Sequence, residues 1–543
     1  MASTANTIPA VLRAAAARHP ELEAIVDGSG GDTEVRLSYR ELDRAVLEVC
    51  RSLIAFGVAP GDRVAIWAQN CWQWCVACLG VAAAGAVTVP INSRFRGREA
   101  AELLDSSEPV LLFTSIGFLG SDYPAMLRAA APRWSGLRTV VLSGTSSGTA
   151  SGTASGTASG TDLSWPDFLA AGAEVPAEAA LERIAAVRPE DPSDIMYTSG
   201  TTGSPKGVVQ THGKNLLAMG SFGAAIGLRE GDRNLVLAPL FAQFGLRCGL
   251  YIDIMVGATT VLDAVFDPGK IVALIERERI SALPGPPTIL AALLSPLAQG
   301  RDLSSLRIAI TGSTIIPEEL VIELLERKVF ESVLTAYGLT EACGPVSVSS
   351  PHDSPATVSR FAGRVMDHLQ IRVVDPDGRT LPAGERGELL VRSAAVMNGY
   401  LNDPEQTAAA VSADGWLRTG DIGLVTAEGY VRITGRLKDM YICGGFNVYP
   451  AEVEATIREH PEVRDVALIG IPDERLGEVG LAYLVLADGA TLDPAAMSTW
   501  CRGVMANYKV PRRFVALDAL PLNSSLKVDK LALRGLTLRP TDD

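Results

Sequence analysis

Residues 197–208 read Tyr-Thr-Ser-Gly-Thr-Thr-Gly-Ser-Pro-Lys-Gly-Val, and this stretch has the clearest chemical potential in the chain. Its glycines let a backbone turn tightly and bring N–H groups close to a ligand. The hydroxyl side chains and Lys206 suit phosphate oxygens. An ordinary flexible surface loop is the alternative, but the lysine, the proline and the β-prone run on each side favour a phosphate cradle.

The residues that follow distinguish this loop from a Walker P-loop, in which Gly-Lys-Ser/Thr opens a helix. Lys206-Gly207 runs instead into Val208-Val209-Gln210-Thr211, which predicts a strand. We therefore expect the loop to join two strands and to close over a nucleotide as a flap.

Further motifs toward the C-terminus contain residues that suit a nucleotide. Tyr337-Gly338-Leu339-Thr340-Glu341 places a carboxylate after a Tyr-Gly turn, where it can hold Mg²⁺ against phosphates while the tyrosine stacks on a base. Trp416–Asp421 ends in an aspartate that can accept hydrogen bonds from both ribose hydroxyls. Gly435–Asp439 is followed by the glycine-led motif Gly444–Glu454. Each motif alone could be a turn, but their order and spacing indicate a single nucleotide-dependent site.

In this combination the chain resembles the adenylate-forming superfamily, most closely the acyl-CoA synthetases of fatty and aryl acids. The resemblance covers nearly the whole chain, from Gly57-Val58-Ala59-Pro60-Gly61-Asp62-Arg63-Val64 to Lys527. It implies an AMP-forming acid–thiol ligase that uses ATP, Mg²⁺ and coenzyme A. A carboxylate attacks the α-phosphate of MgATP to give acyl-AMP and pyrophosphate, and CoA thiolate then displaces AMP.

The resemblance also implies a role for each matching residue. The β- and γ-phosphates are bound by Thr198, Ser199, Gly200, Thr201, Thr202, Gly203 and Lys206. The adenine slot is formed by Gly312, Ser313, Thr314, Ala336, Tyr337 and Gly338. Thr340 contacts the α-phosphate, Glu341 binds Mg²⁺, and Asp421 and Arg436 hold the ribose.

Three positions in the C-terminal part have family counterparts as well. Lys438 matches the hinge, and Gly444 and Gly445 match the wall of the pantetheine tunnel. Lys527 is in register to bridge the carboxylate and the α-phosphate. With Thr198 and Glu341 it completes the expected catalytic residues. We expect the carboxylates of Glu452 and Glu454 to be solvated or helix-capping instead.

The residue before Lys527 departs from the family pattern. The motif usually reads Asn-x-Ser-Gly-Lys, but this chain has Asn523-Ser524-Ser525-Leu526-Lys527. If the glycine needs positive φ, leucine costs about 1 kcal/mol or more, and moving one charge by about an ångström can cost about a hundredfold in rate. The departure predicts impaired adenylation and retained thioesterification of an acyl-adenylate from a separate adenylating enzyme. A loop that simply adjusts is the alternative.

A second departure concerns the acid. Where many acyl-CoA synthetases have histidine, and where peptide-synthetase domains have the aspartate that binds an α-amino group, this chain has Ala242. A buried amine without a partner would cost a few kcal/mol, so we expect a carboxylic acid that is not an amino acid. The substrate residues are expected to be Phe241, Ala242, Gly245 and Gly338, and the small side chains favour a bulky acid.

Two other functions use the same motifs. An acyl-AMP ligase would load the phosphopantetheine of a carrier protein, although the sequence has no carrier domain of its own. A non-catalytic protein would only bind the nucleotide or the acyl-adenylate, although the loop, Glu341, Asp421, Arg436 and Lys527 are all present.

Composition narrows the class and compartment of the protein. The 543 residues carry a formal charge of -14 without a Lys/Arg stripe, which argues against nucleic-acid binding. The N-terminal residues do not show the basic stretch followed by an apolar stretch that is typical of a signal peptide. The apolar run Trp74–Val89 is short for a membrane span, so we expect a cytoplasmic protein. Cys71, Cys75 and Cys78 share one helix face and are expected to be buried apolar residues.

The elements that position these motifs alternate between strand and helix. Strands are predicted at Arg63–Trp67, Ala86–Val89, Val110–Phe113 and Thr139–Leu142, with a helix at Trp72–Ala84, and they indicate an α/β fold with parallel sheets. A flexible Ser/Gly/Thr/Ala loop is expected at 143–161. We expect an N-terminal AMP-binding domain over 1–437 and a small, mobile α+β domain over 438–543. The latter's predicted elements are Ala451–His460, Val463–Ile469, Leu481–Leu486, Pro494–Met505 and Arg513–Leu517.

Overall fold

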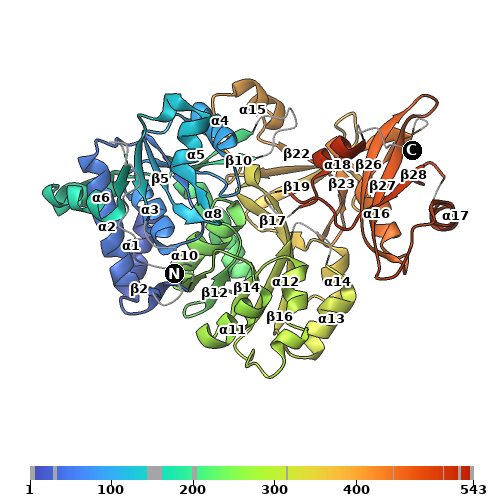
Figure 1. Ribbon diagram of the computed structural model, residues 1–543, viewed down its shortest axis with the longest axis horizontal. Coiled ribbons are helices and arrows are strands. Elements are labelled where there is room, and N and C mark those ends of the chain that lie inside the picture. The colour runs from blue at the N-terminus through green and yellow to red at the C-terminus, as the bar shows by residue number, and fades with distance from the viewer. Residues whose placement is uncertain are drawn as a thin grey trace. The chain divides into compact units, whose positions relative to one another are not determined.

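The computed structural model describes residues 6–28, 34–142, 162–198, 205–312, 316–443, 446–505, 507–523 and 527–537. The predicted linker at 143–161 lies outside these residues. The chain divides into two compact units (Figure 1): unit 1 comprises 1–370 and 391–417, and unit 2 comprises 371–390 and 418–543. The domain boundary that we expect at 437/438 stays a prediction.

The eight-stranded sheet of unit 1 contains the strands beside the phosphate loop. Its order is β21 (Gly399–Tyr400), β11 (Lys206–Thr211), β10 (Pro192–Thr198), β4 (Val87–Pro90), β3 (Arg63–Trp67), β5 (Leu111–Thr114), β8 (Arg138–Val141) and β9 (Asp162–Ser164). Strands β4, β3, β5 and β8 pair in parallel, which confirms the expected arrangement. Strands β10 and β11 are antiparallel, as expected of a loop that joins two neighbouring strands.

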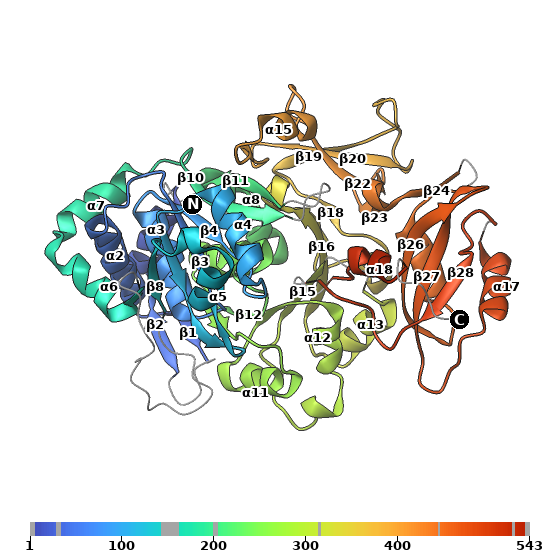
Figure 2. The ribbon, with the colours of Figure 1, turned by 45° about the horizontal axis from the view of Figure 1, so that its top comes forward.

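Helices cover both faces of this sheet (Figure 2). Helices α4 (Gly97–Ser107) and α5 (Tyr123–Ala130) pack on one face, over buried side chains of β3, β4 and β5. On the other face, α3 (Trp72–Ala83) is buried between the sheet and α2 (Tyr39–Ala55), as its apolar residues on every side require. The cysteines of this segment are buried as expected, and burial raises the pKa of Cys71 and Cys78 to about 12.

A nine-stranded sheet presents the remaining motifs of unit 1. Its order is β18 (Arg364–Val365), β17 (Gly344–Val348), β16 (Ser332–Leu339), β15 (Ile308–Gly312), β14 (Ala282–Pro284), β12 (Arg233–Val236), β13 (Thr259–Leu262), β1 (Glu23–Asp27) and β2 (Val35–Ser38). The central strands β14, β15 and β16 pair in parallel, so their carboxyl ends meet at one edge. That edge is where ligands bind in open α/β sheets.

Several of the other helices of unit 1 begin at a capping side chain. For example, α8 (His212–Ile226) begins after Thr211, whose hydroxyl accepts from Lys214 N, and ends at Gly227 with φ 70°. The rest are α1 (Ile8–Arg18), α6 (Trp165–Ala171), α7 (Ala177–Ala186), α9 (Gln243–Gly245), a π-helix (Leu246–Tyr251), α10 (Ile252–Val256), α11 (Pro268–Glu278), α12 (Pro287–Ala292), α13 (Glu318–Glu326), α14 (Pro355–Arg360) and α15 (Pro404–Ala410). A short pair, β6 (Ile116–Phe118) and β7 (Ser121–Asp122), stands apart.

The C-terminal part of unit 2 is an α+β fold. Its strands are β25 (Phe446–Val448), β24 (Tyr441–Cys443), β27 (Gly477–Leu486) and β26 (Val463–Asp473), and β28 (Arg513–Ala516) pairs with β27. The helices are α16 (Pro450–Ile457), α17 (Pro494–Val504) and α18 (Lys530–Thr537). The five elements predicted from the sequence are present, whereas β24, β25 and α18 were not predicted.

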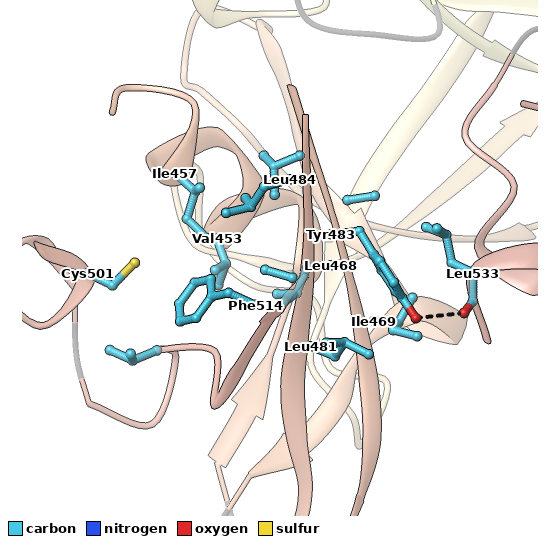
Figure 3. Close-up of a cluster of buried hydrophobic side chains, with 14 of the residues drawn as sticks. Val453, Ile457, Leu468, Ile469, Leu481, Tyr483, Leu484, Cys501, Phe514 and Leu533 are labelled. Atoms are coloured by element: carbon cyan, nitrogen blue, oxygen red, sulfur yellow. Dashed lines mark hydrogen bonds between the residues drawn. The ribbon is translucent and has the colours of Figure 1, made fainter. Parts of the chain in front are cut away.

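Two features stabilise unit 2. Val453 and Ile457 of α16 pack with Leu468 and Leu484 on one face of the sheet, and Ile469, Leu481 and Tyr483 lie on the other face with Leu533 of α18 (Figure 3). The Tyr483 hydroxyl donates to the Leu533 carbonyl at 3.0 Å and so ties α18 to this sheet (Figure 3).

A further sheet has the order β19 (Leu369–Val374), β20 (Gly387–Ser393), β22 (Leu417–Val425) and β23 (Val431–Arg436). Its β22–β23 pair is antiparallel, and the turn between the two strands contains Gly429 with φ 87°.

Candidate active site

The predicted phosphate loop joins strands β10 and β11, which form an antiparallel hairpin. Thr198 pairs with Lys206 as the last partners of the hairpin, and the segment between them crosses residues 199–204, outside the described residues. Gly207 is needed because a Cβ there would lie 2.9 Å from Ile195 and 3.2 Å from the Tyr197 ring. The hairpin therefore fixes Thr198 and Lys206 at the two ends of the loop.

Segment 397–401 holds the return strand of the hairpin from its outer side. Val208 pairs with Tyr400 in β11–β21, and Leu401 N donates to the Gly207 carbonyl at 2.7 Å. At its other end, Met397 N donates to the Glu341 carbonyl at 2.8 Å. One short segment thus connects the phosphate-loop hairpin with the turn that contains Glu341.

The predicted adenine residues lie on neighbouring strands. Gly312 ends β15 and pairs with Ala336 of β16, and Tyr337 and Gly338 follow Ala336 in the same strand. A Cβ on Gly312 would lie 2.8 Å from the Ala336 carbonyl oxygen. The backbones can therefore approach this closely only without a side chain at Gly312. Ser313 and Thr314 lie outside the described residues.

The β16 strand leads into a one-turn 3₁₀ helix, Thr340–Ala342, which presents Glu341. The Tyr400 hydroxyl donates to Oε1 of Glu341 at 3.0 Å. Burial, together with the Glu341 charge, raises the pKa of Tyr400, so the phenol keeps its proton at neutral pH. Nζ of Lys206 lies 5.1 Å from the centroid of the Tyr400 ring and donates to Oε1 of Gln406 at 2.8 Å.

These residues fit a magnesium–nucleotide. Within the part of the chain that the structure describes, no group of three or more His, Cys, Asp or Glu residues could form a metal cage. Mg²⁺ in phosphate-transfer sites uses one or two carboxylates, with the rest of its ligands from phosphates and water. The half-buried Glu341 carboxylate, which accepts from the Tyr400 hydroxyl, can supply such a ligand. The Lys206 ammonium lies near the ring of the same Tyr400 and adds positive charge for the phosphates.

Three of the expected substrate residues, Phe241, Ala242 and Gly245, lie in or directly before α9, and Gly338 lies in β16. Ala242 is the N-cap residue of this helix, and Phe241 and Ala242 are half-buried. A Cβ on Gly245 would lie 2.2 Å from the Pro239 carbonyl oxygen, and one on Gly338 would lie 2.3 Å from that of Gly344. The backbone itself therefore requires glycine at 245 and 338, so their small size alone does not indicate space for an acid.

Sequence reasoning missed a buried charge network directly after these residues. Arg247, fully buried in the π-helix, donates from Nη2 to Oδ1 of Asp194 at 2.6 Å and from Nε to Oδ1 of Asn215 at 2.7 Å. Its Nη1 donates to Oε1 of Gln243 at 3.2 Å. This last bond orients the Gln243 amide, so that its NH₂ group points away from the arginine as a donor.

Unit 2 contains the other predicted residues. Asp421 and Arg436 are cross-strand partners in β22–β23, with Nε 2.8 Å from Oδ1. Lys438 lies in a one-turn 3₁₀ helix, Leu437–Asp439, and Gly444 and Gly445 lie outside the described residues. Lys527 N donates to Oδ1 of Asn523 at 3.1 Å, and Asn523 N donates to the Lys527 carbonyl at 2.7 Å, so the two close a short turn.

The expectation that the carboxylates of Glu452 and Glu454 are solvated or helix-capping is met in part by Glu452, which lies in the first turn of α16 with its side chain 33% exposed, but not by Glu454. Glu452 pairs with Arg386, at 2.9 Å, and with Lys509. Glu454 is 8% exposed, accepts from Leu468 N at 2.7 Å and pairs with Lys530 at 2.8 Å. Partners far away in the sequence therefore neutralise both carboxylates.

Sequence comparisons place this site among known enzymes. Residues 12–401 match the family model described as AMP-binding enzyme, and residues 452–527 match that of its C-terminal domain. A Mycobacterium tuberculosis protein named 3-[(3aS,4S,7aS)-7a-methyl-1,5-dioxo-octahydro-1H-inden-4-yl]propanoyl:CoA ligase is 43% identical over 99% of this chain and 100% of its own. A Rhodococcus jostii protein of the same name is 42% identical over 98% of this chain and 99% of its own.

Solved structures agree with the sequence matches. The crystal structure of ATP-bound MatB from Rhodopseudomonas palustris has a TM-score of 0.83 and 28% identity, and the match covers 98% of this chain and 99% of that one. Among the described residues, no helix has the length and apolar composition needed to cross a membrane.

Proposed function

The chain belongs to the AMP-binding enzyme family, and from that premise we infer that it is an AMP-forming acid–thiol ligase that joins a carboxylic acid to coenzyme A. The predicted resemblance to acyl-CoA synthetases and the α/β fold with a smaller C-terminal part are confirmed by the family and structure matches. ATP, Mg²⁺ and CoA are its co-reactants, and an acyl-adenylate is its intermediate. The observation that best supports this function is the Lys206–Tyr400–Glu341 arrangement beside the phosphate-loop hairpin.

We propose that each predicted site residue acts as its family counterpart does. Thr198, Lys206 and the loop between them hold the β- and γ-phosphates, and Thr340 contacts the α-phosphate. Glu341 would hold Mg²⁺, which supplies positive charge to the triphosphate during transfer. Negative charge develops on phosphoryl oxygens in that step, so preorganised donors rather than a side-chain nucleophile carry the catalysis.

In unit 2 we propose that Asp421 and Arg436 bind the ribose. Lys527 bridges the carboxylate and the α-phosphate in the first half-reaction. Lys438 is the hinge residue at the 437/438 boundary, and Gly444 and Gly445 line the pantetheine path. The cytoplasm is the proposed compartment.

The acid is proposed to be a bulky alicyclic keto acid without an amino group. Two relatives that align with nearly the whole chain are named as ligases of a bicyclic dioxo propanoate. Ala242 supplies no charge to an α-amino group, whereas the neighbouring Gln243 amide, oriented by Arg247, supplies a neutral donor suited to a ketone oxygen. The half-buried Gln243 donor beside the small Ala242 side chain therefore favours a keto acid over an acid with a simple alkyl chain.

We further propose that Leu526 slows the adenylation half-reaction more than thioester formation, so that a separate adenylating enzyme could supply acyl-AMP. Lys527 closes the turn with Asn523, and the residue that precedes it lies outside the described residues. A carrier protein as thiol acceptor, or nucleotide binding without turnover, would use the same residues. CoA is favoured because the relatives are named as CoA ligases.

A panel of acids tests the substrate class. The enzyme with ATP, Mg²⁺ and CoA is incubated with a bicyclic dioxo propanoate, a cinnamate, a linear fatty acid and an α-amino analogue, and thioesters are identified by mass spectrometry. Preference for the bicyclic keto acid is expected. Preference for the linear acid would contradict the substrate class, and absence of any CoA thioester alongside loading of a carrier protein would contradict the choice of acceptor.

A further inference from the structure

Tyr400 lies between the two side chains that are proposed above to bind Mg²⁺ and the terminal phosphates. Its hydroxyl donates to Oε1 of Glu341 at 3.0 Å. The centroid of its ring is 5.1 Å from Nζ of Lys206, within the range of a cation–π contact. All three residues belong to unit 1. The Tyr400 side chain therefore contacts both the Glu341 carboxylate and the Lys206 ammonium of the proposed site.

The backbone around Tyr400 fixes the position of this side chain. Tyr400 pairs with Val208 in β11–β21, and its N donates to Oγ1 of Thr407 at 2.8 Å. Thr407 in turn donates to the Asp403 carbonyl at 2.8 Å, at the start of α15. These bonds do not involve the phenol hydroxyl, so the bond to Glu341 can be removed without opening the β-sheet.

The hydrogen bond also orients the Glu341 carboxylate. Oε1 accepts from the phenol, and none of the described residues donates to Oε2. A carboxylate held by one oxygen can present the other in a fixed direction, and partners of metal-binding side chains commonly set ligand orientation in this way. The Lys206 ammonium is held on the same ring by its bond to Gln406.

We propose that Tyr400 is a positioning residue for the magnesium–nucleotide, which aims Oε2 of Glu341 at the metal and keeps Lys206 beside it. The proposal rests on the proposed function, because that function makes Glu341 the Mg²⁺ residue. The alternative is a tyrosine that only supports the β11–β21 pair. That role would affect stability and nucleotide binding in general, and not the dependence of binding on Mg²⁺.

The Tyr400→Phe variant separates the two roles because it keeps the ring and removes the hydroxyl. Binding of β,γ-methylene-ATP is measured by calorimetry over a range of Mg²⁺ concentrations and in EDTA. Tyr400→Phe is expected to need about tenfold more Mg²⁺ for half-maximal binding, with metal-free binding unchanged. Tyr123→Phe is the matched control, since it removes a hydroxyl that donates to the Ser93 carbonyl at 2.6 Å, and it should behave as the wild type. An unchanged Mg²⁺ dependence in Tyr400→Phe, or an equal loss with and without Mg²⁺, would overturn the proposal.

A double-mutant cycle tests whether the hydroxyl acts through Glu341. In the Glu341→Gln background, Tyr400→Phe should cause no further loss of nucleotide affinity at a fixed Mg²⁺ concentration. An additive loss would overturn the proposal even if the single variant shows the expected shift. A wild-type protein whose nucleotide binding ignores Mg²⁺ would overturn the proposed function as well, whereas a Mg²⁺-dependent wild type with an unaltered Tyr400→Phe variant overturns only this inference.

Discussion

Asp421 and Arg436 face each other across the β22–β23 pair, and Nε of the arginine lies 2.8 Å from Oδ1 of the aspartate. Asp421 is 2% exposed, whereas the Arg436 side chain is 47% exposed. The arginine therefore holds the aspartate in one orientation, which suits the proposed role of this carboxylate as an acceptor for the ribose hydroxyls.

Asp421→Asn should weaken selection of the ribose. The variant replaces a charged acceptor with an amide, and hydrogen bonds to charged groups contribute about 1.5–3 kcal/mol, so ATP affinity is expected to fall about tenfold or more. The affinities of ATP and 2′-deoxy-ATP should become similar because the lost partner is a hydroxyl. Competition binding measures both, with Asp488→Asn at a fully exposed position of unit 2 as the control. Undiminished discrimination in Asp421→Asn would exclude its role at the ribose.

Substitutions at 526 and 527 should separate the two half-reactions. Lys527→Ala is expected to lower pyrophosphate release about a hundredfold or more, because in its proposed role Lys527 supplies positive charge to the phosphoryl transition state. Thioester formation from synthetic acyl-adenylate should stay close to the wild-type rate.

Leu526→Gly should raise pyrophosphate release if the leucine restricts the backbone. Leu526→Ala shortens the side chain without giving the backbone the freedom of glycine, so it should not raise pyrophosphate release. Equal gains from both substitutions would point to side-chain bulk instead.

Removal of one partner of the buried Asp194–Arg247 pair should destabilise unit 1. Both side chains are 0% exposed, so Arg247→Met leaves an uncompensated buried carboxylate, at a cost of about 3–5 kcal/mol. Arg40→Met breaks an ion pair in which the side chains are 66% and 75% exposed, and its cost should stay below about 1 kcal/mol. Urea unfolding followed by tryptophan fluorescence compares the two. Similar midpoints for both variants would contradict the importance of the buried pair.

His212 should make the stability of unit 1 depend on pH. Burial lowers the pKa of its imidazole from 6.5 to about 4, because the charged form loses its hydration. The unfolded chain therefore binds the proton more readily than the folded chain, and the stability from this group is present above pH 6.5 and is lost as the pH falls toward 4. Between pH 7 and pH 5 the loss is about 2 kcal/mol.

The matched variant is His212→Asn, whose side-chain oxygen can still accept from Ile8 N, as Nδ1 of the histidine does at 3.4 Å. Unfolding midpoints at pH 7 and pH 5 should differ less in this variant than in the wild type. An identical pH effect in both proteins would show that other groups cause it.

Local patterns in the sequence predict strands and helices better than they predict contacts between side chains that are far apart in the sequence. The loop between β10 and β11, the parallel strands β3, β4, β5 and β8, and helices α16 and α17 follow from periodicity and glycine spacing, which neighbouring residues determine. The Tyr400–Glu341 bond joins residues 59 positions apart, and the Lys530–Glu454 bond joins residues 76 apart. No local pattern specifies such contacts, which is why the sequence suggests a solvated or helix-capping Glu454 and does not single out Tyr400.

The stoichiometry of one turnover mixture tests the central claim most directly. The enzyme is incubated with a bicyclic dioxo propanoate, ATP, Mg²⁺ and CoA, and AMP, pyrophosphate and CoA thioester are quantified together. An adenylate-forming ligase produces the three in equal amounts, and each depends on the acid. Release of ADP and phosphate, or AMP and pyrophosphate without any thioester, would contradict the account.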